Sequence, residues 1–307
     1  MTATDRRHMA RALELARRGL WSTDPNPRVG CVIADGERVL AEGWHERAGG
    51  PHAELAALAA LGGRAPGATA YVNLEPCCHH GRTPPCADAL AVAGIARVVY
   101  AVRDPNPRVN GGGAARLAAA GVALQGGVME PEARALNPGF LSRFERGRPW
   151  VRVLLPGAQP VHLVEELRAR SSAVLTGCGT VLADDPRPEV RLPGARRQPL
   201  RVVLDARLCT PPRARLLAAP GQALVLTASG DARRRAALEA AGARVENLPA
   251  AAGGLELAAV LARLAELEVN EALVEAGARL TRAFCDAGLA DERIDAVPAG
   301  TGAGRSL

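Results

Sequence analysis

The sequence contains no lysine, so all 38 of its basic side chains are arginines. This absence excludes Schiff-base chemistry on a lysine and the phosphate-binding lysine of a Walker A loop. Arginine still binds phosphate well, often through two parallel hydrogen bonds. The net charge of +6 therefore suits a phosphorylated substrate, although a well-solvated, arginine-rich surface is the simpler explanation.

Aromatic residues are also scarce, at 3%, so alanine, leucine and valine must fill the cores. No apolar run approaches the roughly 18 residues of a membrane span, and the N-terminal "MTATDRRHMARALELARRGL" lacks the apolar segment of a signal peptide. Seven cysteines, an odd number that includes the adjacent Cys77 and Cys78, argue against a disulfide framework. We expect a cytoplasmic protein that binds neither membranes nor nucleic acid.

Strand and helix patterns alternate along the chain and predict an α/β protein with a mixed sheet in its first half. Residues 5–18 fit a helix, residues 29–44 a hairpin turning at Asp35-Gly36, and residues 131–144 a single helix. The polar "RGRPW" at 146–150 marks a boundary, after which a second α/β pattern begins. We expect domains at 1–147 and 148–307.

The hexapeptide "DPNPRV" occurs twice, at 24–29 and at 104–109. Two prolines within four positions make each copy a rigid turn. The repeat could be a coincidence of two similar turns. Alternatively, both loops line one pocket, and each presents an asparagine, Asn26 or Asn106, to a polar ligand.

Cysteines and histidines concentrate in "PHAEL" at 51–55 and "EPCCHHGRTPPC" at 75–86. His52 offers a nitrogen ligand and Cys77 and Cys86 offer two thiolates, a donor set that leaves a fourth zinc position open. Glu54 need not bind metal and can move a proton between attacking water and leaving amine. The pattern H-x-E followed by P-C and a second cysteine is typical of zinc-dependent base deaminases.

The spacing leaves other zinc ligands possible. Eight residues separate Cys77 from Cys86, whereas the usual deaminase has C-x-x-C, and His79 and His80 are further candidates. Cys78 cannot easily share one small metal with its neighbour and is expected to pack or to stay a free thiol. A purely structural zinc site is the competing interpretation.

Four segments together resemble the bifunctional deaminase–reductase of riboflavin biosynthesis: "PNPRVGCVI", "GWHERAGGPHAE", "LEPCCHHGRTPPC" and "RDPNPRVNGGG". The resemblance implies a cytidine-deaminase-like α/β/α domain that deaminates 2,5-diamino-6-(5-phosphoribosylamino)pyrimidin-4-one. It also implies that His52, Cys77 and Cys86 hold Zn²⁺ while Glu54 is the catalytic proton shuttle. The substrate-binding residues that it implies are Asn26, His45, His79, Arg82, Asp104 and Asn106.

The second half resembles the family's dihydrofolate-reductase-like α/β domain, in "LTGCGTVLADDP", "RVVLDARLCTP" and "LVEAGARL". By position, Thr180 and Asp184 would contact NADPH, and Arg191 and Glu275 the substrate. This half departs from the family pattern, because it lacks a lysine-containing strand, an S-L-D-G turn and a tryptophan segment, and it ends before the family's last strands. We therefore expect a truncated domain whose reductase activity is impaired and which persists for stability or dimerisation.

Several alternatives follow from the same residues. The chain could be fully bifunctional, could serve a specialised-metabolite branch, or could be a tRNA or nucleoside deaminase. The tRNA-adenosine type, however, expects C-x-x-C. A zinc-stabilised interaction module is a further option, but it would not need Glu54. We expect a homodimer or a higher homo-oligomer.

Overall fold

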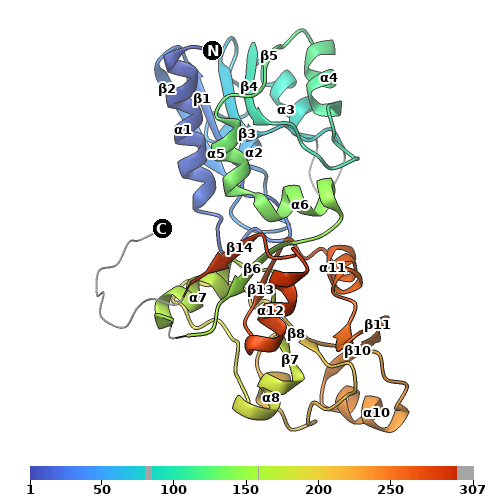
Figure 1. The fold of residues 1–307 in the computed structure, drawn as a ribbon. Coiled ribbons are helices and arrows are strands. Elements are labelled where there is room, and N and C mark those ends of the chain that lie inside the picture. Colours follow the sequence, from blue (N-terminus) through green and yellow to red (C-terminus); the bar gives the residue numbers. More distant parts are fainter. Residues whose placement is uncertain (80–84, 158, 296–307) are drawn as a thin grey trace. The chain divides into compact units, whose positions relative to one another are not determined.

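The computed structural model describes residues 1–79, 85–157 and 159–295, and the chain divides into two compact units, Met1–Arg146 and Gly147–Leu307 (Figure 1). Within the described residues, no helix combines the length and the apolar character that are needed to cross a bilayer. Each unit is an α/β structure built on its own sheet.

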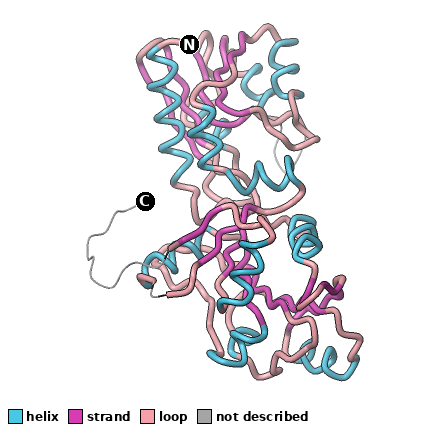
Figure 2. Tube along the Cα trace, in the orientation of Figure 1, coloured by secondary structure: helices cyan, strands magenta, loops and turns pink. Residues whose placement is uncertain are grey.

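The first unit is built on a mixed sheet with the strand order β2-β1-β3-β4-β5. Its strands are β1 (Gly30–Asp35), β2 (Arg38–Trp44), β3 (Thr69–Leu74), β4 (Arg97–Val102) and β5 (Ala123–Gln125). β1 runs antiparallel to β2 and β3, whereas β3, β4 and β5 are parallel. The predicted hairpin is confirmed, because β1 and β2 lie side by side as antiparallel strands joined by a short turn (Figure 2). Asp35 faces Arg38 across this turn, in which Gly36 has a φ of 55°.

Helices cover both faces of this sheet, which makes the first unit an α/β/α sandwich (Figure 1). One face is covered by α1 (Ala3–Arg17), α5 (Glu130–Leu136) and α6 (Pro138–Arg146), and the other by α2 (Ala53–Ala59), α3 (Cys86–Val92) and α4 (Gly112–Ala119). Strand side chains alternate between the faces, so Val32 joins the core under α1 while Cys31 and Ile33 join the core under α2.

The single helix predicted for residues 131–144 is wrong, because the structure ends α5 at Leu136 and begins α6 at Pro138. Pro138 has no backbone N–H and disfavours helical backbone at the residue before it. Asn137 accordingly leaves the helical region, with φ −121° and ψ 41°. Its side chain then fastens the first proline-rich loop: Oδ1 accepts the N–H of Arg28 and Nδ2 donates to the Arg28 carbonyl.

The second unit has an entirely parallel sheet with the strand order β10-β9-β8-β7-β13-β6-β14. Its strands are β6 (Trp150–Leu154), β7 (Ala173–Gly177), β8 (Leu200–Leu204), β9 (Ala223–Thr227), β10 (Ala243–Asn247), β13 (Glu271–Val274) and β14 (Glu292–Ile294), with a small ribbon of β11 (Ala250–Ala251) and β12 (Gly254–Leu255). Its helices are α7 (Val161–Arg170), α8 (Cys178–Asp184), α9 (Arg215–Ala218), α10 (Ala232–Ala240), α11 (Leu257–Glu266) and α12 (Ala278–Asp286). Only six residues connect β6 to α7.

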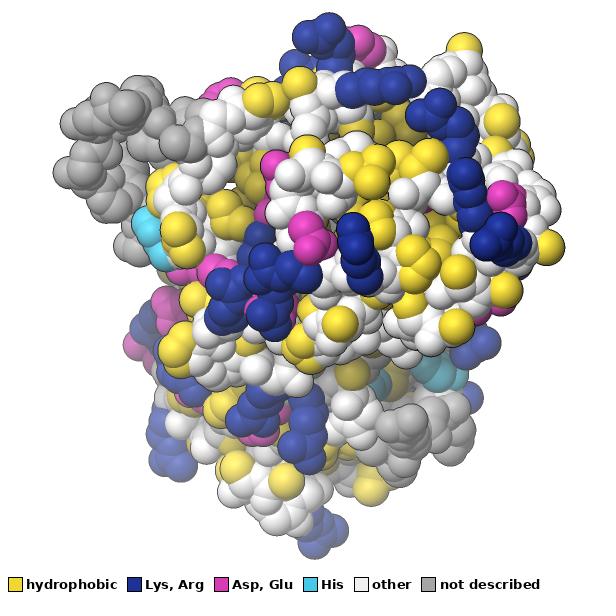
Figure 3. Space-filling view, turned by 90° about the horizontal axis from the view of Figure 1, so that it is seen from below, with side chains coloured by type: hydrophobic (Ala, Val, Ile, Leu, Met, Phe, Trp, Pro, Cys, Tyr) yellow, Lys and Arg dark blue, Asp and Glu magenta, His cyan; other side chains and the backbone are white. Residues whose placement is uncertain are grey.

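Arginine side chains occur at several separate places on the face viewed in Figure 3, among acidic and apolar side chains. Many of the chain's arginines have carboxylate partners. Arg148 pairs with Asp291 at 2.7 Å and Arg263 with Glu246 at 2.7 Å. Much of the positive charge is therefore balanced locally.

Candidate metal centre and deaminase site

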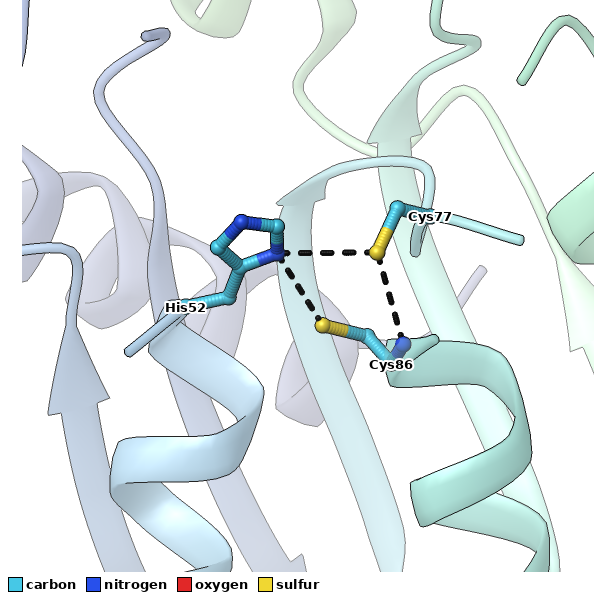
Figure 4. Close-up of side chains that lie close together, drawn as sticks. All are labelled: His52, Cys77 and Cys86. Atoms are coloured by element: carbon cyan, nitrogen blue, oxygen red, sulfur yellow. Dashed lines mark hydrogen bonds between the residues drawn. The ribbon is translucent and has the colours of Figure 1, made fainter. Parts of the chain in front are cut away.

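His52, Cys77 and Cys86 come together at the ends of three elements (Figure 4). His52 immediately precedes α2, Cys77 follows β3, and Cys86 is the first residue of α3. The Nδ1 atom of His52 lies 3.3 Å from the sulfur of Cys86 and 3.5 Å from the sulfur of Cys77. Residues 34 positions apart in sequence thus face one point.

These distances suit zinc. With Zn–N near 2.0 Å and Zn–S near 2.3 Å, tetrahedral geometry places a nitrogen and a sulfur ligand about 3.5 Å apart. The three ligand atoms lie within 4.8 Å of one another. One imidazole and two thiols are also the donor types that zinc prefers, so these residues fit the ion and leave a fourth position open.

The surroundings favour a thiolate at Cys77. Its pKa is lowered to about 4, first by a hydrogen bond from the Cys86 thiol and then, against the cost of burial, by hydrogen bonds from His52 and from the Cys86 backbone. The backbone N–H of Cys86 donates to the Cys77 sulfur at 3.4 Å. For Cys86, the hydrogen bond with Cys77 and burial raise the pKa, so negative charge resides first on Cys77.

Glu54 lies one residue inside α2 and is 3% exposed. Burial raises its pKa to about 7, and the negative charge of Cys77 adds to this effect while His52 opposes it. The position of α2 depends on Gly43 in β2, because a Cβ there would stand 2.4 Å from the Ala53 carbonyl oxygen. Glycine therefore lets α2 approach the sheet and places both His52 and Glu54.

Asn26, from the first proline-rich loop, contacts buried His45 beside the metal centre. His45 Nδ1 must donate to the carbonyl of Pro51, 2.8 Å away, because a carbonyl only accepts. Burial lowers the pKa of His45, so its neutral ring has Nε2 free to accept the Asn26 amide at 3.0 Å. The Asn26 carbonyl oxygen is then left to accept from a ligand, and the His45 ring lies 5.5 Å from that of His52.

The second proline-rich loop is organised by Glu75, a residue that no predicted site included. Its carboxylate is 3% exposed and accepts three backbone N–H groups, from Asp104 at 3.3 Å and from Gly111 and Ala114 at 3.0 Å. Gly113 packs against the same strand end, because a Cβ there would lie only 1.8 Å from the Pro76 carbonyl oxygen. No sequence signal distinguished Glu75 from an ordinary residue of the "LEPC" motif.

Asp104 and Asn106 occupy the start of this loop. The pKa of Asp104 is raised to about 7, mainly by burial and also by the charges of Glu75 and Cys77, while the hydrogen bond from the Asn106 backbone opposes the rise. Its Oδ1 accepts the N–H of Asn106 at 2.8 Å, and Asn106 Oδ1 accepts the N–H of Arg108. Asp104 is therefore close enough to the metal centre for the charge of Cys77 to affect its pKa, while the Asn106 side chain stabilises the turn.

The remaining predicted residues of this site divide by position. His79 is half-buried and lies outside the group of ligand-type atoms found among the described residues. Arg82 and His80 lie outside the described residues. Cys78 points away from the metal centre, since its thiol donates to the Arg108 carbonyl at 3.4 Å.

In the second unit, Glu275 directly follows β13 and Thr180 lies in the first turn after β7, so both are at carboxyl ends of strands, where open α/β sheets bind ligands. Asp184 is the last residue of α8, and Arg191 lies in the segment between α8 and β8. Thr180 of α8 accepts the Gly277 N–H at 3.0 Å and Asp184 is exposed. Arg191 donates to Glu189 at 3.1 Å, and Glu275 accepts from Arg168 at 2.8 Å. The two predicted substrate residues thus already have charged partners.

The mixed sheet, with H-x-E opening one helix and a cysteine opening the next, defines the first unit as a zinc-dependent deaminase domain. The family model for the cytidine and deoxycytidylate deaminase zinc-binding region matches residues 2–102. The model for the RibD C-terminal domain matches residues 155–307.

Relatives resemble the chain across both units. The riboflavin biosynthesis protein RibD of Escherichia coli is 42% identical, over 94% of this chain and 86% of the relative. The structure of Acinetobacter baumannii RibD superposes with a TM-score of 0.88 at 37% identity, covering 99% of this chain and 92% of that one. A Thermotoga maritima structure gives 0.82 at 32% identity, covering 97% and 88%. The chain belongs to the RibD family of riboflavin biosynthesis proteins.

Proposed function

We propose that residues 1–147 catalyse the hydrolytic deamination of 2,5-diamino-6-(5-phosphoribosylamino)pyrimidin-4-one in riboflavin biosynthesis. The observation that carries this proposal is the meeting of His52, Cys77 and Cys86 beside buried Glu54. The related Thermotoga maritima protein is described as a diaminohydroxyphosphoribosylaminopyrimidine deaminase and 5-amino-6-(5-phosphoribosylamino)uracil reductase.

The chain's own residues account for the proton transfers. Zinc held by His52, Cys77 and Cys86 would supply a Lewis acid that makes water nucleophilic at neutral pH. Glu54 accepts a proton as the water oxygen bonds to the amine-bearing ring carbon. It then returns this proton to the amine as the carbon–nitrogen bond breaks and ammonia leaves.

Substrate contacts come from the two proline-rich loops. Asn26, whose amide is held by His45, presents its carbonyl oxygen to the amino groups of the pyrimidine ring. Asp104 and Asn106 line the pocket from the second loop, which Glu75 anchors. We assign His79 and Arg82 to the ribose-phosphate end, because arginine suits a phosphate.

The variant Glu54→Gln tests the assignment. It preserves the size of the side chain but removes the proton acceptor, so we expect full zinc content and a loss of ammonia release of about 10²–10⁴-fold. Glu46→Gln, on the exposed loop after β2, is the matched control and should behave as wild type. Substantial ammonia release by Glu54→Gln would refute the role of Glu54.

For residues 148–307 we infer an impaired reductase. Arg191 and Glu275 already pair with Glu189 and Arg168, and the connection between β6 and α7 is only six residues long. NADPH, if it binds, would lie against Thr180 and Asp184 at the start and end of α8. Neither side chain carries a positive charge for its phosphates, which is why we expect weak binding.

Full bifunctionality is the second candidate, and it is favoured by the match of family models to both units and of relatives along 94% of the chain. One assay distinguishes the impaired reductase from the bifunctional enzyme: NADPH absorbance and ammonia release are followed together after the diaminopyrimidinone ribotide is added. Ammonia without NADPH oxidation supports an impaired reductase, whereas both signals establish the bifunctional enzyme. Neither signal from zinc-loaded protein would point to another substrate, such as a nucleoside or tRNA. The homo-oligomer stays a prediction, which light scattering can check.

A further inference from the structure

A second group of metal-ligand side chains lies in the second unit, apart from the deaminase site. Cys178, Asp205 and Cys209 place their ligand atoms within 4.8 Å of one another. Cys178 directly follows β7, and Asp205 directly follows β8. Because these strands are parallel neighbours, with Gly177 opposite Leu204, their carboxyl ends bring both residues to one edge of the sheet. Cys209 returns to this edge in the turn after β8.

Asp205 is held in a fixed orientation. It is 0% exposed, its Oδ1 accepts the N–H of Cys209 at 2.9 Å, and its Oδ2 accepts the N–H of Thr210 at 2.7 Å. Each carboxylate oxygen has a second lone pair that these bonds leave available. Backbone donors of this kind orient a metal-binding carboxylate and restrict its movement.

The spacing and the charge suit a thiophilic dication. Around a tetrahedral zinc ion, two thiolates stand about 3.8 Å apart, so ligand atoms within 4.8 Å need to move by no more than about 1 Å. Two thiolates and a carboxylate carry three negative charges, which Zn²⁺ and the nearby guanidinium of Arg207 would balance. Mg²⁺ and Ca²⁺ prefer oxygen ligands and suit this set poorly.

We propose that Cys178, Asp205 and Cys209 form a second Zn²⁺ site, at the carboxyl ends of β7 and β8. The bound ion joins the first residue of α8 to the turn at 205–210, and it keeps a fourth position for water or a ligand. It stabilises the second unit, because the folded unit gathers ligands that the unfolded chain separates. The proposal does not depend on the deaminase activity.

The test is zinc stoichiometry of the full chain. Protein is stripped with a chelator under a phosphine reductant, loaded with Zn²⁺, desalted and analysed for metal. We expect two zinc equivalents in wild type, one in the double variant Cys178→Ser/Cys209→Ser, and two in Cys285→Ser. Cys285 is a half-buried cysteine of the same unit and serves as the matched control. Cys86→Ser should also bind one equivalent, since it removes a ligand of the deaminase site.

Alkylation of wild-type protein gives a measurement that needs no variant. Zn²⁺ should slow iodoacetamide labelling of Cys178 and Cys209, mapped by mass spectrometry, and leave that of Cys285 unchanged. A single zinc equivalent in reduced wild type that is lost in Cys86→Ser would overturn the proposal, because that ion would belong to the deaminase site. Equal zinc content in wild type and the double variant would also overturn it, as would labelling rates of Cys178 and Cys209 that do not change when Zn²⁺ is added. Co²⁺ bound to Cys86→Ser should still show the absorption of a thiolate-ligated ion, because the second site keeps its two cysteines. The deaminase assignment and this proposal can therefore fail separately.

Discussion

Glu75 should control the second proline-rich loop through three backbone N–H groups, and Glu75→Gln tests this. Oε2 accepts from Asp104 and Gly111, and Oε1 accepts from Ala114. A glutamine has only one acceptor oxygen, so its NH₂ group must face at least one of these donors. The variant therefore loses at least one hydrogen bond to a buried charge, which is worth about 1.5–3 kcal/mol.

This loss should appear as faster local opening. A free energy of 1.5–3 kcal/mol corresponds to about a 10- to 150-fold change in the opening equilibrium. Hydrogen exchange followed by mass spectrometry on peptides covering residues 104–115 measures it directly. We also expect a higher KM for deamination, because Asp104 and Asn106 belong to the loop, with zinc content unchanged.

The matched control is Glu132→Gln, an exposed position in α5 that should exchange as wild type does. Exchange of the loop within about twofold of wild type would refute the positioning role of Glu75. Faster exchange throughout the first unit would also contradict it, since the reasoning requires a local effect. A fall in activity without faster exchange would mean that Glu75 acts on the reaction by another route.

Three further outcomes follow from the first unit. Gly43→Ala should lower the free energy of unfolding by about 1–3 kcal/mol and slow deamination, because its Cβ would meet the backbone of α2. Thermal unfolding measures this, with Gly230→Ala as the control, since a Cβ at Gly230 has open space. The Arg97 hydrogen bond holds the pKa of Asp5 well below its usual range, so the pair stabilises the fold above about pH 4 and this stabilisation is lost as the pH falls further. Asp5→Asn should thus lower the melting temperature at pH 7, and its curve should converge with that of wild type in acid; a constant gap down to pH 2 would disprove this. Chelation should abolish ammonia release and added Zn²⁺ should restore it, and activity that survives complete zinc removal would contradict the metal assignment.

The local patterns of the sequence were sufficient for most of the first unit. The Asp35-Gly36 turn predicted the hairpin, and apolar periodicity predicted the first helix. The ligand types in "PHAEL" and "EPCCHH" predicted a zinc-binding group, because this chemistry depends on a few side chains at short range. The helix predicted for residues 131–144 was wrong because the restriction that Pro138 imposes on Asn137 outweighs the apolar pattern.

Other features depend on residues that only the tertiary structure brings together. Glu75 contacts backbone groups 29 to 39 positions away, and no local pattern encodes such distances. The tautomer of His45, and with it the orientation of Asn26, follows from the Pro51 carbonyl.

Residue types and their local spacing were sufficient for the family resemblance, the alternation of strands and helices, and the donor types for zinc. Which donors meet depends on the folded arrangement of the strands. Cys178 and Asp205 are 27 positions apart, and they become neighbours only because β7 and β8 pair in parallel and end at the same edge. The chemistry of a side chain is fixed by the residue type at its position. The geometry of a site depends instead on strand order and register, which result from the packing of the whole sheet.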